Sequence, residues 1–158
     1  MNDLQRMEKT HMIRLRSFTA HDALIIQQKQ YPDMPAEDIR KMIAEWETNS
    51  YQGKLFEMYA ITAGNTVVGS ISLYEHTKNV ASIGIDIYPD ERRKGYASEA
   101  MRLMADRART LGYRIIQDQV RADNQPSIAL HQNQGFETDG YVYQNTKGES
   151  VFLYLLCL

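Results

Sequence analysis

The alternation of apolar and polar residues along the chain predicts a protein built from many short strands. Segments rich in β-branched and aromatic residues are separated by turn residues, as strands usually are. These segments are residues 12–18, 55–62, 66–76, 80–89, 113–122, 136–144 and 150–158. Within residues 80–89, Ile83, Ile85 and Ile87 fall on one face of the predicted strand and Asp86 falls on the other.

Apolar residues spaced three and four apart predict helices at residues 19–30, 36–49, 96–111 and 126–134. The helix at residues 96–111 has the clearest pattern, because Ala100, Met101, Met104 and Ala108 share one side. Gly112 follows it, where a helix C-terminus favours glycine.

The order of these elements predicts an α/β fold with a mixed, mostly antiparallel sheet flanked by helices. Short turns at Gly64-Asn65 and Lys78-Asn79 join neighbouring strands as hairpins, so these strands should be antiparallel. The helix between residues 80–89 and 113–122 is a crossover, so those two strands should be parallel. Residues 1–10 are polar and are predicted to be a mobile extension, and residues 11–158 to be one domain.

Composition narrows the classes of protein. A chain of 158 residues with 43% hydrophobic residues can form the core of a single domain, and its net charge of -2 does not indicate a nucleic-acid partner. No apolar run is long enough to span a membrane, and the start has no apolar signal-peptide segment, so we expect a cytoplasmic protein. Cys157 is expected to be a buried strand residue, and the histidines show no metal-ligand spacing, so no metal site is predicted.

The segment "PDERRKGYASEA", residues 89–100, combines cations and a glycine at the start of the predicted helix. The unpaired backbone N–H groups and the positive dipole end of a helix N-terminus attract anions. A glycine there lets an anion approach the backbone closely, so the segment is a candidate pyrophosphate site. The alternative is a solvated charged turn. The segment matches neither the P-loop nor the dinucleotide glycine motif, which disfavours ATP and NAD.

The segment "ADNQPSIALHQNQGF", residues 122–136, follows the second parallel strand. Asn124 lies at the start of a short helix, and Ser127 and His131 share one helical face. Ligands in open α/β sheets bind beyond the carboxyl ends of parallel strands, so both segments point to one site. The alternative is an ordinary helix cap by Asn124, with Ser127 and His131 in solvent.

Together, the two segments resemble the GNAT superfamily of acyl-CoA-dependent N-acetyltransferases, and the resemblance extends from Ile13 to the end of the chain. The family motif Q/R-x-x-G-x-G/A, which follows a strand, is similar to residues 92–97 here. The downstream pattern N-x-x-S/A-x-x-x-Y-x-x-x-G-F matches Asn124, Ser127, Gly135 and Phe136, with His131 in place of the tyrosine. The resemblance implies that the two central parallel strands splay apart and hold acetyl-CoA, the co-substrate, between them.

The resemblance also implies which residues contact acetyl-CoA. Ile85 and Ile87 would pair with the pantetheine arm, and Asn124, Ser127 and His131 would reach the cofactor from the other side. The pyrophosphate would lie on the loop and first helical turn formed by Arg92, Arg93, Lys94, Gly95, Tyr96, Ala97 and Ser98.

The implied activity is direct transfer of an acetyl group to a primary amine on a protein N-terminus, a polyamine or a small amine. The alternative is a non-catalytic acyl-CoA-binding sensor or subunit. We expect no nucleic-acid or membrane partner, and a homodimer is left open.

Transfer of the acetyl group needs a base for the amine and an acid for the departing thiolate. Asp86 is the first candidate base, with Glu57 and Glu75 as alternatives. His131 is the first candidate acid, because an imidazole can donate a proton near neutral pH. Tyr141, Tyr143 or water could serve instead.

Overall fold

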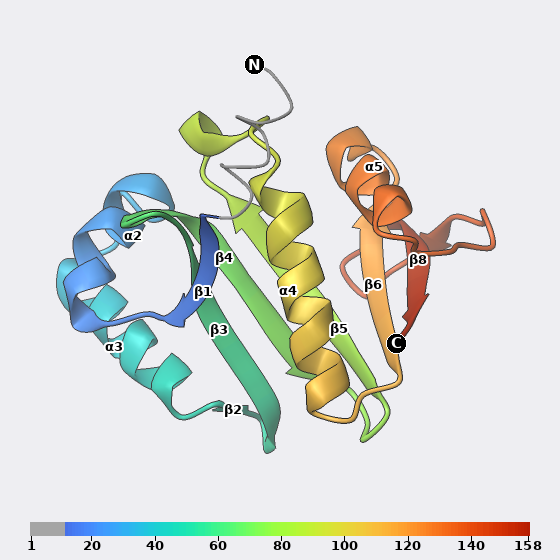
Figure 1. The fold of residues 1–158 in the computed structure, drawn as a ribbon, viewed down its shortest axis with the longest axis horizontal. Helices are drawn as coiled ribbons and strands as arrows, with labels where there is room; N and C mark the ends of the chain where they lie inside the picture. Colours follow the sequence, from blue (N-terminus) through green and yellow to red (C-terminus); the bar gives the residue numbers. More distant parts are fainter. Residues whose placement is uncertain (1–11) are drawn as a thin grey trace.

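The computed structural model describes residues 12–158, which form one open sheet with helices on both faces (Figure 1). The predicted N-terminal extension, residues 1–10, lies outside the described residues. The strands are β1 (Ile13–Ser17), β2 (Ser50–Tyr51), β3 (Lys54–Ala63), β4 (Thr66–Glu75), β5 (Val80–Ile87), β6 (Ile115–Arg121), β7 (Tyr143–Gln144) and β8 (Ser150–Cys157). The helices are η1 (Ala20–Asp22), α2 (Ala23–Lys29), α3 (Ala36–Glu47), η2 (Pro89–Glu91), α4 (Tyr96–Thr110) and α5 (Gln125–Asn133), of which η1 and η2 are 3-10 helices.

The predicted mixed sheet is confirmed. Its strand order is β1-β3-β4-β5-β6-β8-β7, with β2 paired to β3. The two predicted hairpins join β3 to β4 and β4 to β5 as antiparallel pairs, and β5 and β6 are parallel. Helix α4 is therefore the crossover that connects β5 to β6, the parallel neighbours in this sheet.

The strand predicted at residues 136–144 is mostly wrong. Only β7 and an isolated bridge between Glu137 and Leu155 form there. Gly140 has a positive φ of 79°, and the side chains of Tyr141, Val142 and Tyr143 are exposed. The apolar pattern that favours a strand has no facing layer to pack on here, because β7 is the outer edge of the sheet.

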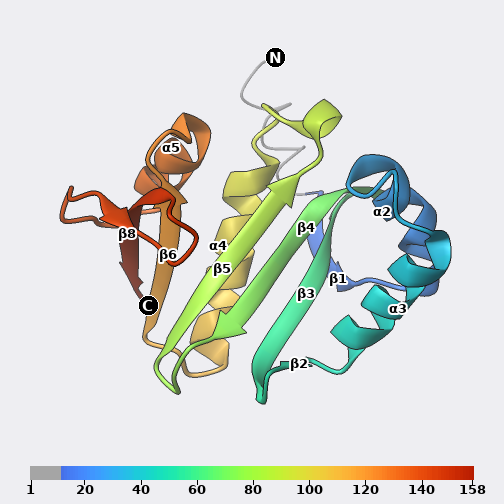
Figure 2. The same ribbon diagram turned by 180° about the vertical axis from the view of Figure 1, so that it is seen from behind.

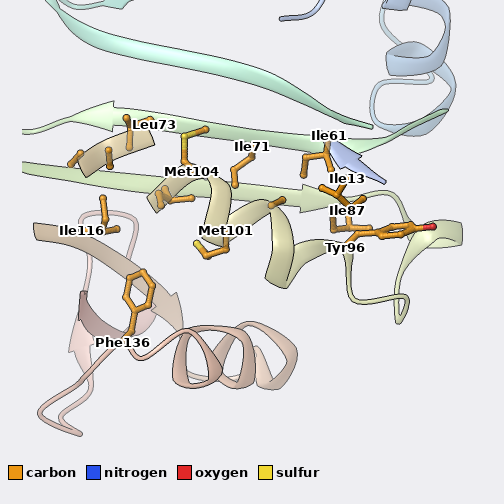
Figure 3. Close-up of a cluster of buried hydrophobic side chains, with 14 of the residues drawn as sticks. Ile13, Ile61, Ile71, Leu73, Ile87, Tyr96, Met101, Met104, Ile116 and Phe136 are labelled. Atoms are coloured by element: carbon orange, nitrogen blue, oxygen red, sulfur yellow. The ribbon is translucent and has the colours of Figure 1, made fainter. Parts of the chain in front are cut away.

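Two hydrophobic clusters cover the two faces of the sheet. On one face, Met101 and Met104 of α4 pack with Ile71, Ile87 and other strand residues (Figure 3). On the other face, helices α2 and α3 pack on Ala60, Val67 and Tyr88. The alternation along β5 therefore directs its isoleucines toward α4 and Tyr88 toward α2 and α3, as the sequence predicts.

Strands β5 and β6 separate soon after they begin. Their ladder consists of the pairs Val80↔Ile115 and Ala81↔Ile116, whereas β6 pairs with β8 along its whole length. Figure 2 shows the two strands diverging toward the end of β5 that leads into η2. The splayed parallel pair predicted from the family resemblance is therefore present.

Strand β5 stays with β4 where it leaves β6. A Cβ atom on Gly69 of β4 would lie 2.1 Å from the backbone oxygen of Asp86, so only glycine allows the two backbones to approach this closely. The divergence is thus one-sided: β1, β3, β4 and β5 form one unit of the sheet, and β6, β8 and β7 form the other (Figure 2).

Cys157 is exposed, so the prediction of a buried strand residue is wrong. Phe152, Tyr154 and Leu156 of β8 pack in the core beside α4, and Cys157 alternates with them. On the other face of β8, Leu153, Leu155 and Cys157 line a surface hollow of about 550 Å³.

An ion pair between a buried carboxylate and a partly exposed arginine ties α4 to the sheet at the closed end of the divergence. The Glu57 carboxylate is 4% exposed and accepts hydrogen bonds from Arg107 Nη2 at 2.8 Å and Arg107 Nε at 3.1 Å. Tyr59 Oη donates a further hydrogen bond to it at 3.0 Å. Loss of the arginine would leave a buried carboxylate without its cation, which is more costly than losing an exposed ion pair.

Arg107→Ala is therefore expected to lower the free energy of unfolding by about 1–3 kcal/mol, because it removes two charge-assisted hydrogen bonds from a buried acceptor. Arg109→Ala on the same helix removes an exposed ion pair with Asp106 and should cost about 0–1 kcal/mol. Urea unfolding of both variants measures the difference. Equal losses would show that the Glu57–Arg107 pair has no special weight.

Candidate functional site

The N-terminus of α4 opens beside the divergence of β5 and β6. Gly95 is its N-cap residue, with a φ of 81°, and no side chain caps the helix there. A Cβ atom on Gly95 would meet nothing within 4 Å, so glycine is needed here for its backbone conformation and not for packing. The preceding Arg93 also has a positive φ, of 62°. Two residues with positive φ thus precede a helix N-terminus without a side-chain cap, an arrangement that suits an anion.

The three cations of this loop are placed differently from one another. Arg92 Nε donates to the Ile87 carbonyl at 2.8 Å, and its Nη2 lies 3.5 Å from Asp86 Oδ1. Lys94 Nζ is 2.8 Å from Glu91 Oε2. Within residues 12–158, the guanidinium of Arg93 has no hydrogen bond or ion pair with another side chain. Arg93 is therefore the cation of this loop that is free to meet an anion.

The backbone of β5 presents polar groups to the divergence. Tyr88 N donates to Val68 O at 2.9 Å, so Tyr88 and Val68 are a hydrogen-bonded pair of the antiparallel ladder between β5 and β4. Because hydrogen-bonded and non-bonded pairs alternate, Ile83, Ile85 and Ile87 turn their N–H and C=O groups away from β4 and toward β6. The ladder with β6 ends at Ala81, so these groups face the gap between the two strands.

Asn124 behaves as the helix cap that the sequence analysis offered as an alternative. Its Oδ1 accepts a hydrogen bond from Ser127 N at 3.1 Å at the start of α5. The N-terminus of α5 follows the carboxyl end of β6, across the divergence from α4 (Figure 1). The two predicted segments are therefore on opposite sides of the same gap.

His131 is not in solvent. It is 4% exposed and packs against the rings of Phe136 and Tyr154. Its Nδ1 lies 2.8 Å from the Ser127 carbonyl oxygen, and its Nε2 lies 2.9 Å from Asp118 Oδ2. A carbonyl oxygen only accepts, so Nδ1 carries a hydrogen. The imidazole would have to break one of these bonds before it could donate to a ligand.

Asp118 is the residue that the sequence analysis missed. It is 3% exposed on β6, and its Oδ1 accepts a hydrogen bond from Ile83 N at 2.8 Å. The signal was present in the sequence, because Asp118 lies on the same strand face as Ile116 and Val120, which are both buried. A carboxylate on an apolar strand face needs buried partners.

The candidate bases are separated by the structure. Asp86 is near the end of β5 that diverges from β6, with a side chain that is 44% exposed and accepts a hydrogen bond from Gln30 Nε2 at 2.7 Å. Of the alternatives, Glu57 is held by Arg107, and Glu75 Oε1 accepts from Tyr113 Oη at 3.0 Å. Both lie near the closed end, where β4 residues Leu73 and Glu75 face Ile83 and Ala81.

The alternative acids Tyr141 and Tyr143 lie away from the divergence. Tyr143 is on β7, which β8 separates from β6, and its hydroxyl donates to Asp139. Tyr141 is exposed in the adjoining segment. Neither tyrosine reaches the gap between β5 and β6 in this arrangement.

Tyr88 has an unusual environment on the α2 side of β5. It is 0% exposed, and within residues 12–158 its hydroxyl is the buried side-chain polar atom that lacks a hydrogen-bond partner. Burial, together with the nearby carboxylates of Asp86 and Asp22, raises the pKa of Tyr88 to about 12.

Two negative findings apply to the described residues. In residues 12–158, no group of histidine, cysteine, aspartate and glutamate side chains is arranged to hold a metal ion. The same part of the chain has no helix that is both long and apolar enough to cross a bilayer.

Many solved structures share this fold, and two of them are acetyltransferases with named acceptors. Spermidine N-acetyltransferase from Vibrio cholerae, in complex with CoA and spermine, has a TM-score of 0.77 at 16% identity, over 93% of this chain and 96% of that one. An acetyltransferase from Salmonella typhimurium that modifies the N-terminal serine of a 50S ribosomal subunit protein has a TM-score of 0.78 at 21% identity, over 93% and 95%. At these identities the similarity establishes the fold.

Sequence comparison identifies the family. The SPbeta prophage-derived uncharacterized N-acetyltransferase YokL of Bacillus subtilis (strain 168) is 30% identical over 100 residues, which are 61% of this chain. The match spans only 56% of that relative's length. Residues 4–137 match the family described as "Acetyltransferase (GNAT) domain". The chain therefore belongs to the GNAT acetyltransferase family.

Proposed function

We propose that the protein is an N-acetyltransferase that moves an acetyl group from acetyl-CoA directly to a primary amine. The observation that carries this proposal is the set of β5 backbone groups that face the divergence, beside a helix N-terminus without a side-chain cap. An extended ligand with amide groups and a diphosphate is complementary to both features. Acetyl-CoA has both groups, and family membership supports it as the co-substrate.

The cofactor would be held by backbone and side chains together. The N–H and C=O groups of Ile85 would pair with the pantetheine arm as a strand edge pairs with a peptide. The N–H groups from Gly95 to Ser98 would bind the pyrophosphate, with Arg93 supplying a free positive charge. Asn124 and Ser127 would approach from the α5 side.

The reaction needs no covalent enzyme intermediate. The neutral amine attacks the thioester carbonyl carbon, a C–N bond forms, and the oxyanion is stabilised by the Ile87 N–H that faces the gap. The C–S bond then breaks, the nitrogen of the new amide gives its remaining extra proton to water, and coenzyme A leaves as a thiolate that water protonates to the thiol. Asp86, on the opposite face of β5 from the isoleucines, takes the proton of the incoming ammonium, directly or through water.

The acceptor is proposed only as a class. Asp86 and Gln30 present a carboxylate and an amide on the α2 side of β5, which suits a cationic amine before it loses its proton. The similar structures are named for a polyamine and for a protein N-terminus, and both acceptors are primary amines. A cytoplasmic location and a homodimer stay predictions.

A second function has one observation in its favour. Both ring nitrogens of His131 are engaged, so the residue at the family's tyrosine position is not ready to protonate a thiolate. A protein that binds acyl-CoA without turnover, as a sensor or subunit, would need no such acid. Release of thiol from acetyl-CoA with a panel of amines separates this candidate from the enzyme.

Gly95→Glu is expected to abolish stabilisation by coenzyme A, because the new side chain brings bulk and negative charge against the pyrophosphate. For the parent protein, ligand at about 100 times Kd adds about 2.7 kcal/mol, or a Tm rise of roughly 5–10 °C. Gly53→Glu is the control, since Gly53 has a φ of 78° and open space around its Cβ position, so both variants suffer the same backbone strain.

Thermal unfolding with and without coenzyme A measures both variants. Gly53 lies in the turn between β2 and β3, at the opposite end of the sheet from Gly95 (Figure 1). Its variant should lose stability but keep the ligand-dependent rise in Tm. A normal rise in Gly95→Glu would move the pyrophosphate away from the start of α4.

Asp86→Asn should lower kcat/KM by about 10²–10⁴-fold, because the amide cannot accept the ammonium proton. Binding of acetyl-CoA should be unchanged, since the Asp86 side chain lies on the other face of β5 from the isoleucines. Asp90→Asn is the control: it removes a nearby exposed carboxylate whose partner is Lys29. Thiol release at saturating acetyl-CoA is the measurement, and full activity of Asp86→Asn would exclude Asp86 as the base.

A further inference from the structure

Asp118 connects the two strands that diverge and the helix beside them. Its Oδ1 accepts from Ile83 N of β5 at 2.8 Å, and its Oδ2 lies 2.9 Å from His131 Nε2 of α5. His131 Nδ1 continues the chain of contacts to the Ser127 carbonyl at 2.8 Å. The carboxylate and the imidazole are almost completely buried, so their positions are fixed by these partners.

The contact lies at the point where the ladder ends. The last ladder pair is Ala81↔Ile116, and continuing that parallel register by two residues would bring Ile83 opposite Asp118. The Ile83 N–H therefore points at the place where β6 would otherwise supply a backbone carbonyl. The Asp118 side chain takes that hydrogen bond instead, and a side chain reaches across a wider separation than a ladder allows.

The arrangement is poorly explained by stability alone. Burying a carboxylate with an imidazole costs desolvation free energy, and well-packed apolar residues at such positions are often equally or more stable. However, two apolar side chains in place of Asp118 and His131 could not accept a hydrogen bond from the Ile83 N–H. Without that acceptor, β6 would be free to pair with β5 further along and close the gap.

We propose that Asp118 is a positioning residue that sets where β5 and β6 part, and that His131 acts through it to anchor α5 beside the gap. The proposal rests on the function proposed above, because the gap is where the cofactor would bind. It assigns to His131 an architectural role in place of a proton transfer. The rings of Phe136 and Tyr154 pack against the imidazole and restrict its orientation, with centroids 4.8 Å and 5.6 Å from that of His131.

The carboxylate's charge is not required by this role, and that gives a rescue variant. In Asp118→Asn, the amide oxygen can still accept from Ile83 N. The amide N–H can donate to His131 Nε2, while Nδ1 keeps its hydrogen for the Ser127 carbonyl. All three hydrogen bonds survive, so this variant should bind acetyl-CoA like the parent protein.

The decisive variant is the double replacement Asp118→Leu with His131→Leu, which fills the site with apolar groups and should fold. It should raise the Kd and the KM for acetyl-CoA by about 10- to 100-fold, the scale of a misplacement of about 1 Å, with a smaller change in the acceptor KM. Arg107→Ala is the control for general destabilisation, because it weakens the sheet at the closed end and should leave both constants unchanged.

Calorimetry with coenzyme A and steady-state kinetics on the four proteins give the result. Weak cofactor binding in the double variant, with Asp118→Asn close to the parent, supports the positioning role. Parent-like Kd and KM in the double variant would overturn it and leave the proposed function standing. If the double variant does not fold, the Asp118→Asn protein decides: a tenfold loss of affinity there would refute a role that depends only on hydrogen bonds. Absence of binding by the parent itself would refute the proposed function and this inference together.

Discussion

The structure depends on how the backbone groups on the free edge of β5 are satisfied. A strand in the middle of a sheet normally has neighbours on both sides, yet β5 loses its second neighbour after Ala81. Unpaired backbone groups inside a protein are costly, so each one needs another partner. Asp118 takes the Ile83 N–H and Arg92 takes the Ile87 carbonyl. The N–H and C=O groups of Ile85, between these two, are the ones that the proposed function assigns to the pantetheine arm.

Packing keeps the gap from closing. Helix α4 contacts β1, β4 and β5, whereas α5 packs on β6, so the two halves of the sheet each have a helix of their own on the same face (Figure 1). Gly69 has no side chain, which allows β4 to stay close to β5 at the point of divergence. Because protein interiors are close-packed, neither half can move toward the other without displacing the core side chains between them. The core on this face therefore supports the two halves of the sheet in their separate positions.

Periodicity and turn chemistry predicted most of the fold, because strands β3 to β5 have apolar residues that helices cover on both faces of the sheet. The glycine turn at the start of α4 could also be predicted, since glycine and helix starts have local signatures. The burial of His131 could not: helical spacing places it on the same face as Ser127 but does not say that this face meets the sheet. The one indication was Asp118 between Ile116 and Val120, a carboxylate on an apolar strand face that requires a buried partner. Residues 136–144 failed for the opposite reason, because a strand pattern without a facing layer does not pack.

The exchange of a tyrosine for His131 changes what this position can do. A phenol at the start of the gap could point to the ligand, whereas this imidazole is bound at both nitrogens and enclosed by aromatic rings. Under the proposed function, a thiolate released beside β5 would then take its proton from water. Under this proposal, His131 positions structure and does not transfer a proton. The hydrogen bonds that occupy its two nitrogens belong to the network that keeps β5 and β6 apart.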